Sequence, residues 1–316
     1  MTTDPIIECV PNFSVGNDAS KVAAIMRSMK VDGVHLLDYS RDADHNRSVV
    51  TIAGAPDAVL EAAVRSAGAA AELIDLTRQR GVHPRIGAAD VIPFVPVSGI
   101  SLAECAVIAR QAGLQIWRRF GVPVYFYGAA ATRPDRVELE NVRRGQFEGL
   151  RDISFRDTAR RPDVGGPELH PTAGASAVGA RSFLIAYNIY VEPKESLPAG
   201  SIQWPDIGVV RAIAREVRAS SGGLHGVKAI GVIANGRAQV SMNITDYRIM
   251  PVQRVHEAVQ RLASRHGARC VSGELIGLIP EEAYEPEEQW AKEIADFDPN
   301  RKILERRLAH PLDWPK

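Results

Sequence analysis

The sequence predicts an α+β protein of two tandem ferredoxin-like subdomains, each with the element order βαββαβ, and a ligand cleft between them. Strand-like apolar runs and segments of helical periodicity follow one another in this order twice along the chain. The length of 316 residues suits two domains of roughly 150 residues each. A stretch rich in glycine and proline, 159–180, lies between the repeats, and we divide the chain into subdomains 1–178 and 179–316.

In the first repeat, runs of β-branched residues and of alternating apolar residues predict strands, and apolar residues spaced about 3.6 positions apart predict helices. The expected elements are a strand over 6–13, a helix capped by Asn17 or Asp18, adjacent strands over 34–40 and 48–54, a helix over 56–77 and a strand over 91–97. Pro93 and Pro96 predict an edge or end position for the last strand, because proline cannot donate to a sheet. A capping box at Ser101 and Glu104 then predicts an appended helix to Phe120, followed by a strand.

The second repeat has the same order. We expect a strand over 183–191, a helix from about Pro205, strands over 227–234 and 237–244 around an Asn235-Gly236 turn, a helix through Val252 and Leu262, and a strand over 268–279. The segment 297–308 predicts one capped terminal helix. Residues 159–180 form a loop too long to be a simple connection, and loops of this length commonly bind a ligand.

Composition indicates a soluble globular protein without a nucleic-acid or membrane partner. Apolar residues make up 45% and charged residues 24%, and the net charge is zero. No apolar run approaches the roughly 20 residues of a membrane span. The three cysteines, Cys9, Cys105 and Cys270, lie in apolar runs and predict buried thiols in a reducing compartment. With no secretory signal in the first ten residues, we expect a cytoplasmic protein.

His83 is the first candidate for chemistry. It lies between Gly81 and Pro84 on a turn between a helix and a strand, where a neutral imidazole can shuttle a proton near pH 7. The alternative is a histidine with a surface or packing role. His45 and His170 also lie in loops, but no two of the three histidines have the close spacing of zinc ligands, so we expect no metal.

Other polar segments leave alternatives open. The stretch 174–181 lacks the lysine of a phosphate loop and precedes a strand, so it does not predict a nucleotide site. Asp38 and Asp90 lie near strand ends, where carboxylates either reach a ligand or serve in turns and caps. Five arginines either form a solvated face or attract a polyanion, namely those at 143, 144, 159, 160 and 161.

Several blocks of the chain resemble glutamate formimidoyltransferases. HPRIGAADVIPF at 83–94 is very similar to HPRMGALDVCPF of that family, and IECVPNFS at 7–14 is similar to VECVPNFS. Further similar blocks are LLD and NRSVVTI within 36–52, ELID at 72–75, GVPVYFY at 121–127, GASAVGARSFLIAYN at 174–188, VKAIG at 227–231, ELIGLIP ending at 280 and FDPNRKILE at 297–305. They cover nearly the whole chain and correspond to the transferase part, without the cyclodeaminase that some relatives carry.

The resemblance implies a folate-dependent transferase of histidine degradation that moves a formimino group from N-formimino-L-glutamate to nitrogen 5 of tetrahydrofolate. It implies two formiminotransferase subdomains, a homodimer, and tetrahydrofolate as co-substrate without a metal. His83 matches the catalytic histidine, which would take the proton from nitrogen 5 and protonate the departing amine. The folate-binding loop would comprise Gly166, Pro167, Glu168, Leu169, His170, Pro171, Thr172, Ala173, Gly174 and Ala175. The substrate-contact candidates are Asp38, Asn46, Arg47, Arg85 and Arg181.

Three positions depart from the family pattern. Val82 stands where the family often has glutamate, Val15 where it often has Ser-Glu-Gly, and Ala173 where the folate loop has tryptophan. A formimino group is cationic, so the missing carboxylates predict a weaker preference for formiminoglutamate over neutral formylglutamate. Asp38, Asp44 or Glu168 are the carboxylates that would compensate. The alternative functions are formyl transfer from N-formylglutamate and non-catalytic binding of folate or an amino acid.

Overall fold

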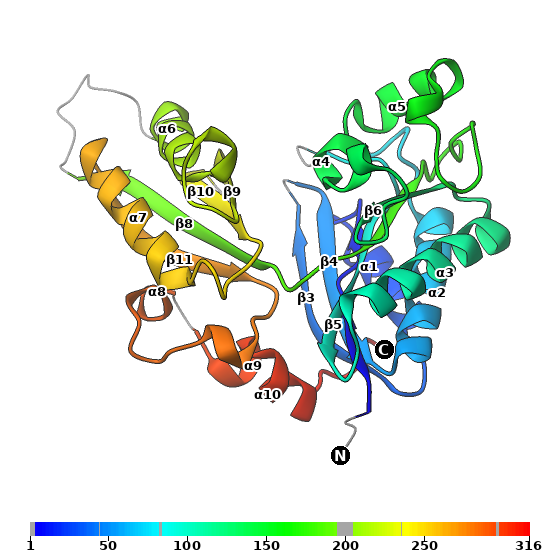
Figure 1. Ribbon diagram of the computed structural model, residues 1–316, viewed down its shortest axis with the longest axis horizontal. Helices are drawn as coiled ribbons and strands as arrows, with labels where there is room; N and C mark the ends of the chain where they lie inside the picture. The colour runs from blue at the N-terminus through cyan, green and yellow to red at the C-terminus, as the bar shows by residue number, and fades with distance from the viewer. Residues whose placement is uncertain (1–3, 44, 82–83, 195–204, 235, 295–296) are drawn as a thin grey trace. The chain divides into compact units, whose positions relative to one another are not determined.

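The protein is a mixed α+β chain of two compact units, described here by a computed structural model (Figure 1). The structure describes residues 4–43, 45–81, 84–194, 205–234, 236–294 and 297–316. Unit 1 comprises Met1–Ser182 together with Pro311–Lys316, and unit 2 comprises Phe183–His310. The last residues belong to unit 1 because the Leu312 N–H donates to the Leu36 carbonyl at 2.8 Å.

The described residues of unit 1 form a seven-stranded sheet. Its strands are β1 (Ile6–Cys9), β2 (Asn12–Phe13), β3 (Val34–Asp42), β4 (Arg47–Gly54), β5 (Ala89–Ser98), β6 (Val124–Gly128) and β7 (Ser176–Ala180). Strands β1 and β2 lie end to end between β4 and β5, so the order across the sheet is β3, β4, β1 with β2, β5, β7, β6. Strands β5, β7 and β6 run parallel to one another, and the other pairs are antiparallel.

Three helices pack on one face of this sheet (Figure 1): α1 (Ala19–Ser28), α2 (Pro56–Leu73) and α3 (Leu102–Phe120). The predicted caps are confirmed. Asp18 accepts hydrogen bonds from the N–H groups of Ser20 and Lys21 at the start of α1, and Ser101 and Glu104 form a reciprocal capping box on α3. Further helical segments follow β6: η1 (Pro134–Arg136), α4 (Leu139–Val142), α5 (Gln146–Arg156) and η2 (Thr158–Arg160).

Two expectations for unit 1 were wrong. Strand β5 is not an edge strand, since it pairs with β1 and β2 on one side and β7 on the other. Pro93 is tolerated because the N–H that it lacks falls where the partner strand is already interrupted between β1 and β2, and its carbonyl still accepts from the Val10 N–H at 3.2 Å. The expected loop 159–180 also ends in strand β7, whose small residues fit between two parallel neighbours.

Unit 2 repeats the order strand, helix, two strands, helix, strand: β8 (Ile185–Pro193), α6 (Ile207–Val217), β9 (Val227–Ala234), β10 (Arg237–Ile244), α7 (Val252–Arg265) and β11 (Ala268–Ile276). The sheet order is β11, β8, β10, β9, and all pairs are antiparallel. Helices α6 and α7 pack on one face (Figure 1) over a core that includes Tyr187, Val240 and Trp290. As the Asn235-Gly236 turn predicts, Ala234 and Arg237 are paired across the hairpin.

The C-terminal part of unit 2 differs from the single helix expected over 297–308. After β11 the chain forms η4 (Glu281–Ala283), α8 (Gln289–Lys292), α9 (Pro299–Lys302) and α10 (Leu304–Ala309). A further short segment, η3 (Ala219–Ser221), lies earlier, between α6 and β9. Asp298 caps α9 as the pattern indicates. The helix then stops at Ile303, which is buried and bridges to Ile279, with the Leu304 N–H donating to the Ile279 carbonyl at 2.8 Å. A tertiary contact therefore divides the helix.

Candidate functional site

The turn that carries Val82 and His83 lies outside the described residues, and its surroundings in unit 1 are formed by the segments on either side of it. Gly81 precedes the turn and packs directly on the β3–β4 connection, because a Cβ atom there would lie 2.4 Å from the His45 carbonyl oxygen. Only glycine fits this position without displacing the backbone. The close approach fixes where the chain enters the turn.

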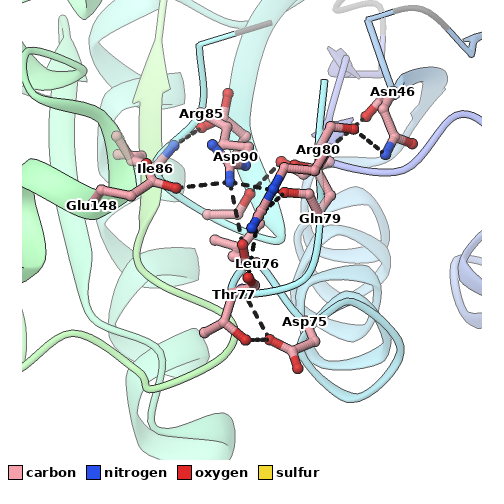
Figure 2. Close-up of polar contacts among 12 residues, drawn as sticks. Asn46, Asp75, Leu76, Thr77, Gln79, Arg80, Arg85, Ile86, Asp90 and Glu148 are labelled. Atoms are coloured by element: carbon pink, nitrogen blue, oxygen red, sulfur yellow. Dashed lines mark hydrogen bonds and ion pairs between the residues drawn. The ribbon is translucent and has the colours of Figure 1, made fainter. Parts of the chain in front are cut away.

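Asn46 ties three segments together next to this entry point. Its Oδ1 accepts from the N–H groups of Gly16 at 2.9 Å and Asn17 at 3.3 Å, and its Nδ2 donates to the Arg80 carbonyl at 2.7 Å. The Gln79 side chain donates to the Asn46 carbonyl at 3.1 Å (Figure 2). Asn46 has a φ of 48°, a left-handed conformation that asparagine tolerates better than most residues. The family-matched candidate Asn46 is thus a structural tie for the segment before His83.

Arg85 holds the exit side of the same turn. It is 7% exposed, and its Nη2 donates to the Leu76 and Gln79 carbonyls at 3.2 and 3.3 Å and to Glu148 at 3.0 Å (Figure 2). Its own carbonyl accepts from the Phe147 N–H at 2.8 Å. A cavity of about 300 Å³ opens beside it, lined by Thr77, Gln79, Arg80, Gly81, Arg85, Phe147, Glu148 and Arg151. Its lining includes Gly81 and Arg85, from either side of positions 82 and 83, and three of its lining residues are arginines.

Both carboxylate oxygens of Asp90 are bound by residues near the turn, so Asp90 is not a free carboxylate at a strand end. It is buried at the start of β5, where Oδ1 accepts from the Ile86 N–H at 2.7 Å and Oδ2 pairs with Arg143 at 2.5 Å. Arg143 therefore belongs to a buried ion pair and not to the solvated face that was one reading of the arginine run. Arg160 likewise donates to the carbonyls of Asn141 and Arg144, at 2.9 and 2.5 Å.

Arg47 completes a cationic group at this end of the sheet. Its Nη2 donates to the Asn12 side chain, and burial of its guanidinium, with the positive charge of Arg143, lowers the pKa of Arg47 to about 10. The Nε atoms of Arg47, Arg85 and Arg143 are buried and have no hydrogen-bond partner within the described part of the chain. Such donors are costly to bury unsatisfied.

The loop 166–175 is hydrogen-bonded to both sides of the His83 turn. The Thr172 carbonyl accepts from the Leu76 N–H at 2.8 Å, before the turn. After it, the Ala173 carbonyl accepts from the Ala88 N–H at 2.9 Å and the Ala175 N–H donates to the Ile86 carbonyl at 3.0 Å. The two segments also approach closely at Gly174, which has a φ of 69° and whose Cβ atom would lie 2.2 Å from the Ile86 carbonyl oxygen. This juxtaposition joins two segments that are about 90 residues apart in the chain.

Members of the loop differ in what they can offer a ligand. Leu169, Ala173, Gly174 and Ala175 are buried, Glu168 and Pro171 are exposed, and Gly166, Pro167, His170 and Thr172 are half-buried. The Ala173 methyl group is 1% exposed and packs in the core, so it is not a surface for stacking an aromatic ligand. The His170 Nδ1 accepts from the Ala173 N–H at 3.0 Å, and burial lowers the pKa of this histidine. Its imidazole is a neutral acceptor that shapes the loop.

The remaining candidates lie on other strands. Asp38 is half-buried in β3 and pairs with Thr51 of β4, while Arg181 directly follows β7 and its N–H donates to the Phe94 carbonyl at 3.1 Å. Neither residue takes part in the backbone hydrogen bonds given above between the loop and the described segments on either side of positions 82 and 83. Val15 is 4% exposed and belongs to the core, so position 15 does not present a side chain to a ligand. Asp44 lies outside the described residues.

Several residues of this site were not found from the sequence. Gln79, Phe147 and Glu148 contact Asn46 and Arg85. Glu148 lies 63 positions from Arg85, and a pair so far apart leaves no local spacing signal.

Among the described residues, no group of three or more His, Cys, Asp or Glu side chains is placed to hold a metal ion. None of the described helices is long and apolar enough to span a bilayer.

Comparison with known proteins identifies the family. Residues 6–181 match the formiminotransferase domain, N-terminal subdomain, and residues 186–290 match the formiminotransferase domain. A glutamate formimidoyltransferase of Streptococcus pyogenes is 40% identical over 96% of this chain and 98% of its own, and one of Thermoplasma acidophilum is 39% identical over 96% and 97%. The formimidoyltransferase-cyclodeaminase of Mus musculus is 36% identical over 87% of this chain and 50% of its own. The chain belongs to the formiminotransferase domain family.

Proposed function

We propose that this protein is a glutamate formimidoyltransferase, which moves the formimino group of N-formimino-L-glutamate to nitrogen 5 of tetrahydrofolate in histidine degradation. The relatives of that name match it over nearly their whole length. One structural observation carries the proposal: the loop 166–175 is bonded to both sides of the turn with His83. A loop for folate and a turn for proton transfer would then be held as one piece, which is what transfer between two bound reactants requires.

His83 is the proposed proton shuttle. As nitrogen 5 bonds to the formimino carbon it must lose a proton, and as the bond from that carbon to the glutamate nitrogen breaks, the departing amine must gain one. An imidazole with an ordinary pKa near 6.5 can accept the first proton and return it in the second step. Asn46 and Arg85, which hold the segments before and after His83, position this imidazole and do not themselves take part in proton transfer.

The arginines beside the turn are the proposed carboxylate binders. Both the glutamate of the donor and the glutamate tail of folate carry carboxylates, and Arg85 lies beside the turn. Arg80 and Arg151 line the adjacent cavity. We assign the cavity to a carboxylate of the substrates, because guanidinium groups bind carboxylates with two parallel hydrogen bonds.

The tandem ferredoxin-like arrangement is part of this proposal. In unit 2 the order β11, β8, β10, β9, with helices α6 and α7 as crossovers, supports a ferredoxin-like subdomain, and the strands from β5 to β3 of unit 1 support a second. Strands β7 and β6 would then extend the first sheet. The subdomain boundary at 178, the ligand cleft, the homodimer and the cytoplasmic location stay predictions.

The test is a transfer assay on His83→Ala, with His35→Ala, an exposed histidine of the same unit, as the matched control. We expect the turnover number of His83→Ala to fall about 100- to 10,000-fold, the usual range for a positioned general acid or base, with little change in tetrahydrofolate affinity. Lost affinity with normal turnover at saturation would make His83 a binding residue. Running the assay with formiminoglutamate and formylglutamate separates the two donors, and turnover with neither would indicate a binding module.

A further inference from the structure

The sheet of unit 2 has a second face, opposite the one covered by α6 and α7, and this face carries a polar network. Side chains alternate along each strand, so the residues between the core positions Tyr187, Ile189 and Val240 point to this opposite face. Two cross-strand rows on it are Glu274, Asn188 and Ser241, and Ser272, Tyr190 and Gln239. Such a face is ordinarily an open polar surface, yet Asn188 and Gln239 are only 8% and 4% exposed.

Glu274 is the centre of this network. One carboxylate oxygen, Oε2, accepts from the side-chain amides of Asn188 at 3.1 Å and Gln239 at 3.2 Å and from the Tyr190 hydroxyl at 3.3 Å. The other oxygen, Oε1, takes none of these bonds. Three donors from two neighbouring strands therefore hold the half-buried carboxylate in one orientation.

The charge of Glu274 is not balanced by the groups that hold it. All three donors are neutral, and the two arginines of this face, Arg237 and Arg269, each lie 3.6 Å from Glu192 instead. Arg237 also stacks on the Tyr190 ring, at 4.3 Å. A partly buried carboxylate held by neutral donors is placed to attract a ligand that brings positive charge or paired N–H donors.

We propose that Glu274 binds, through Oε1, an N–H donor of a group in which two nitrogens are attached to one carbon. This inference rests on the proposed function, whose two substrates both contain that chemistry. One is the amidinium of the formimino donor, and the other is the N3–H with the 2-amino group of the folate pyrimidine ring.

The experiment compares Glu274→Gln with Glu192→Gln, a matched loss of charge on the same sheet face. Dissociation constants are measured by calorimetry, one ligand at a time, for tetrahydrofolate under anaerobic conditions, N-formimino-L-glutamate and N-formyl-L-glutamate. We expect Glu274→Gln to weaken one ligand about 10- to 100-fold, the range of a charge-assisted hydrogen bond, and Glu192→Gln to change none more than twofold. Glu274→Asp, which keeps the carboxylate, should recover part of the loss.

The pattern of affinities identifies the source of the donor pair. Weaker formiminoglutamate binding with unchanged formylglutamate and tetrahydrofolate binding indicates the amidinium, and weaker tetrahydrofolate binding alone indicates the pyrimidine edge. The inference is overturned if folded Glu274→Gln binds all three as the wild type does, or if both glutamine variants lose the same affinity. Affinities decide this even if the wild type transfers nothing, an outcome that would reject only the proposed function.

A second variant keeps the inference testable if Glu274→Gln does not fold. Ser241→Lys introduces an ammonium on the same cross-strand row, from which it can pair with the intact Glu274. It should weaken the same ligand at least tenfold, because the carboxylate is then neutralised. Unchanged affinities for all three ligands in Ser241→Lys would contradict the inference.

Discussion

Asn46→Asp separates the two tasks of one side chain. The Oδ1 atom caps the loop at Gly16 and Asn17, and the Nδ2 atom holds the Arg80 carbonyl just before the His83 turn. Aspartate is nearly the same size, tolerates the positive φ of 48°, and still accepts the two N–H groups. It cannot donate to the Arg80 carbonyl. A carboxylate oxygen of the aspartate would face that carbonyl oxygen where the wild type has a hydrogen bond of 2.7 Å.

The expected magnitudes follow from these contacts. Losing one hydrogen bond costs about 0.5 to 1.5 kcal/mol, and the two retained bonds become charge-assisted, so the unfolding free energy of Asn46→Asp should change by only about 1 kcal/mol. Asn46→Ala loses all three bonds and should be destabilised by about 2 to 4 kcal/mol. The hydrogen bond to the Arg80 carbonyl is nevertheless lost in Asn46→Asp, and displacement of a catalytic group by about 1 Å can cost about 100-fold in rate.

The assay pairs urea unfolding with kcat and KM for both variants. We expect Asn46→Asp to lose at least about tenfold in kcat while staying close to wild-type stability. The retained bond from Gln79 to the Asn46 carbonyl keeps the segment attached, so substrate affinity should change less than kcat. Wild-type kcat in Asn46→Asp would refute the view that the tie to Arg80 positions His83.

Two further predictions concern the loop 166–175. Gly174→Ala should lower the melting temperature and weaken tetrahydrofolate binding, since its Cβ would meet the Ile86 carbonyl at 2.2 Å. The control is Gly149→Ala, where the added Cβ meets nothing within 4 Å. Equal melting temperatures of the two variants would contradict this prediction. Burial lowers the pKa of His170, so the unfolded chain binds the proton more tightly, and the stability contributed by neutral His170 is lost as pH falls below about 6.5. Wild-type unfolding free energy should therefore fall relative to His170→Asn between about pH 7.5 and 5.5, and parallel curves would disprove it.

Local interactions made much of the fold predictable from the sequence. The capping box of Ser101 and Glu104 spans three residues, and the Asp18 cap spans two or three. Periodic apolar residues indicated α1, α2 and α7 near their observed bounds, because helical spacing reports burial directly. His83 was identified as a candidate from its place between Gly81 and Pro84 and then by resemblance, whereas Asn46 and the loop 166–175 were identified by resemblance, from motif residues that lie close together in sequence.

Only the tertiary structure decided which distant segments meet. Strand β7 looked like part of a loop because its short, small-residue sequence has no period of its own, and its place between β5 and β6 comes from pairing. The Arg85–Glu148 and Arg143–Asp90 pairs join residues 63 and 53 positions apart, and Glu274 meets Asn188 across 86. Sequence periodicity records which side of an element is buried, whereas the partner of a buried charge depends on how the whole sheet is ordered.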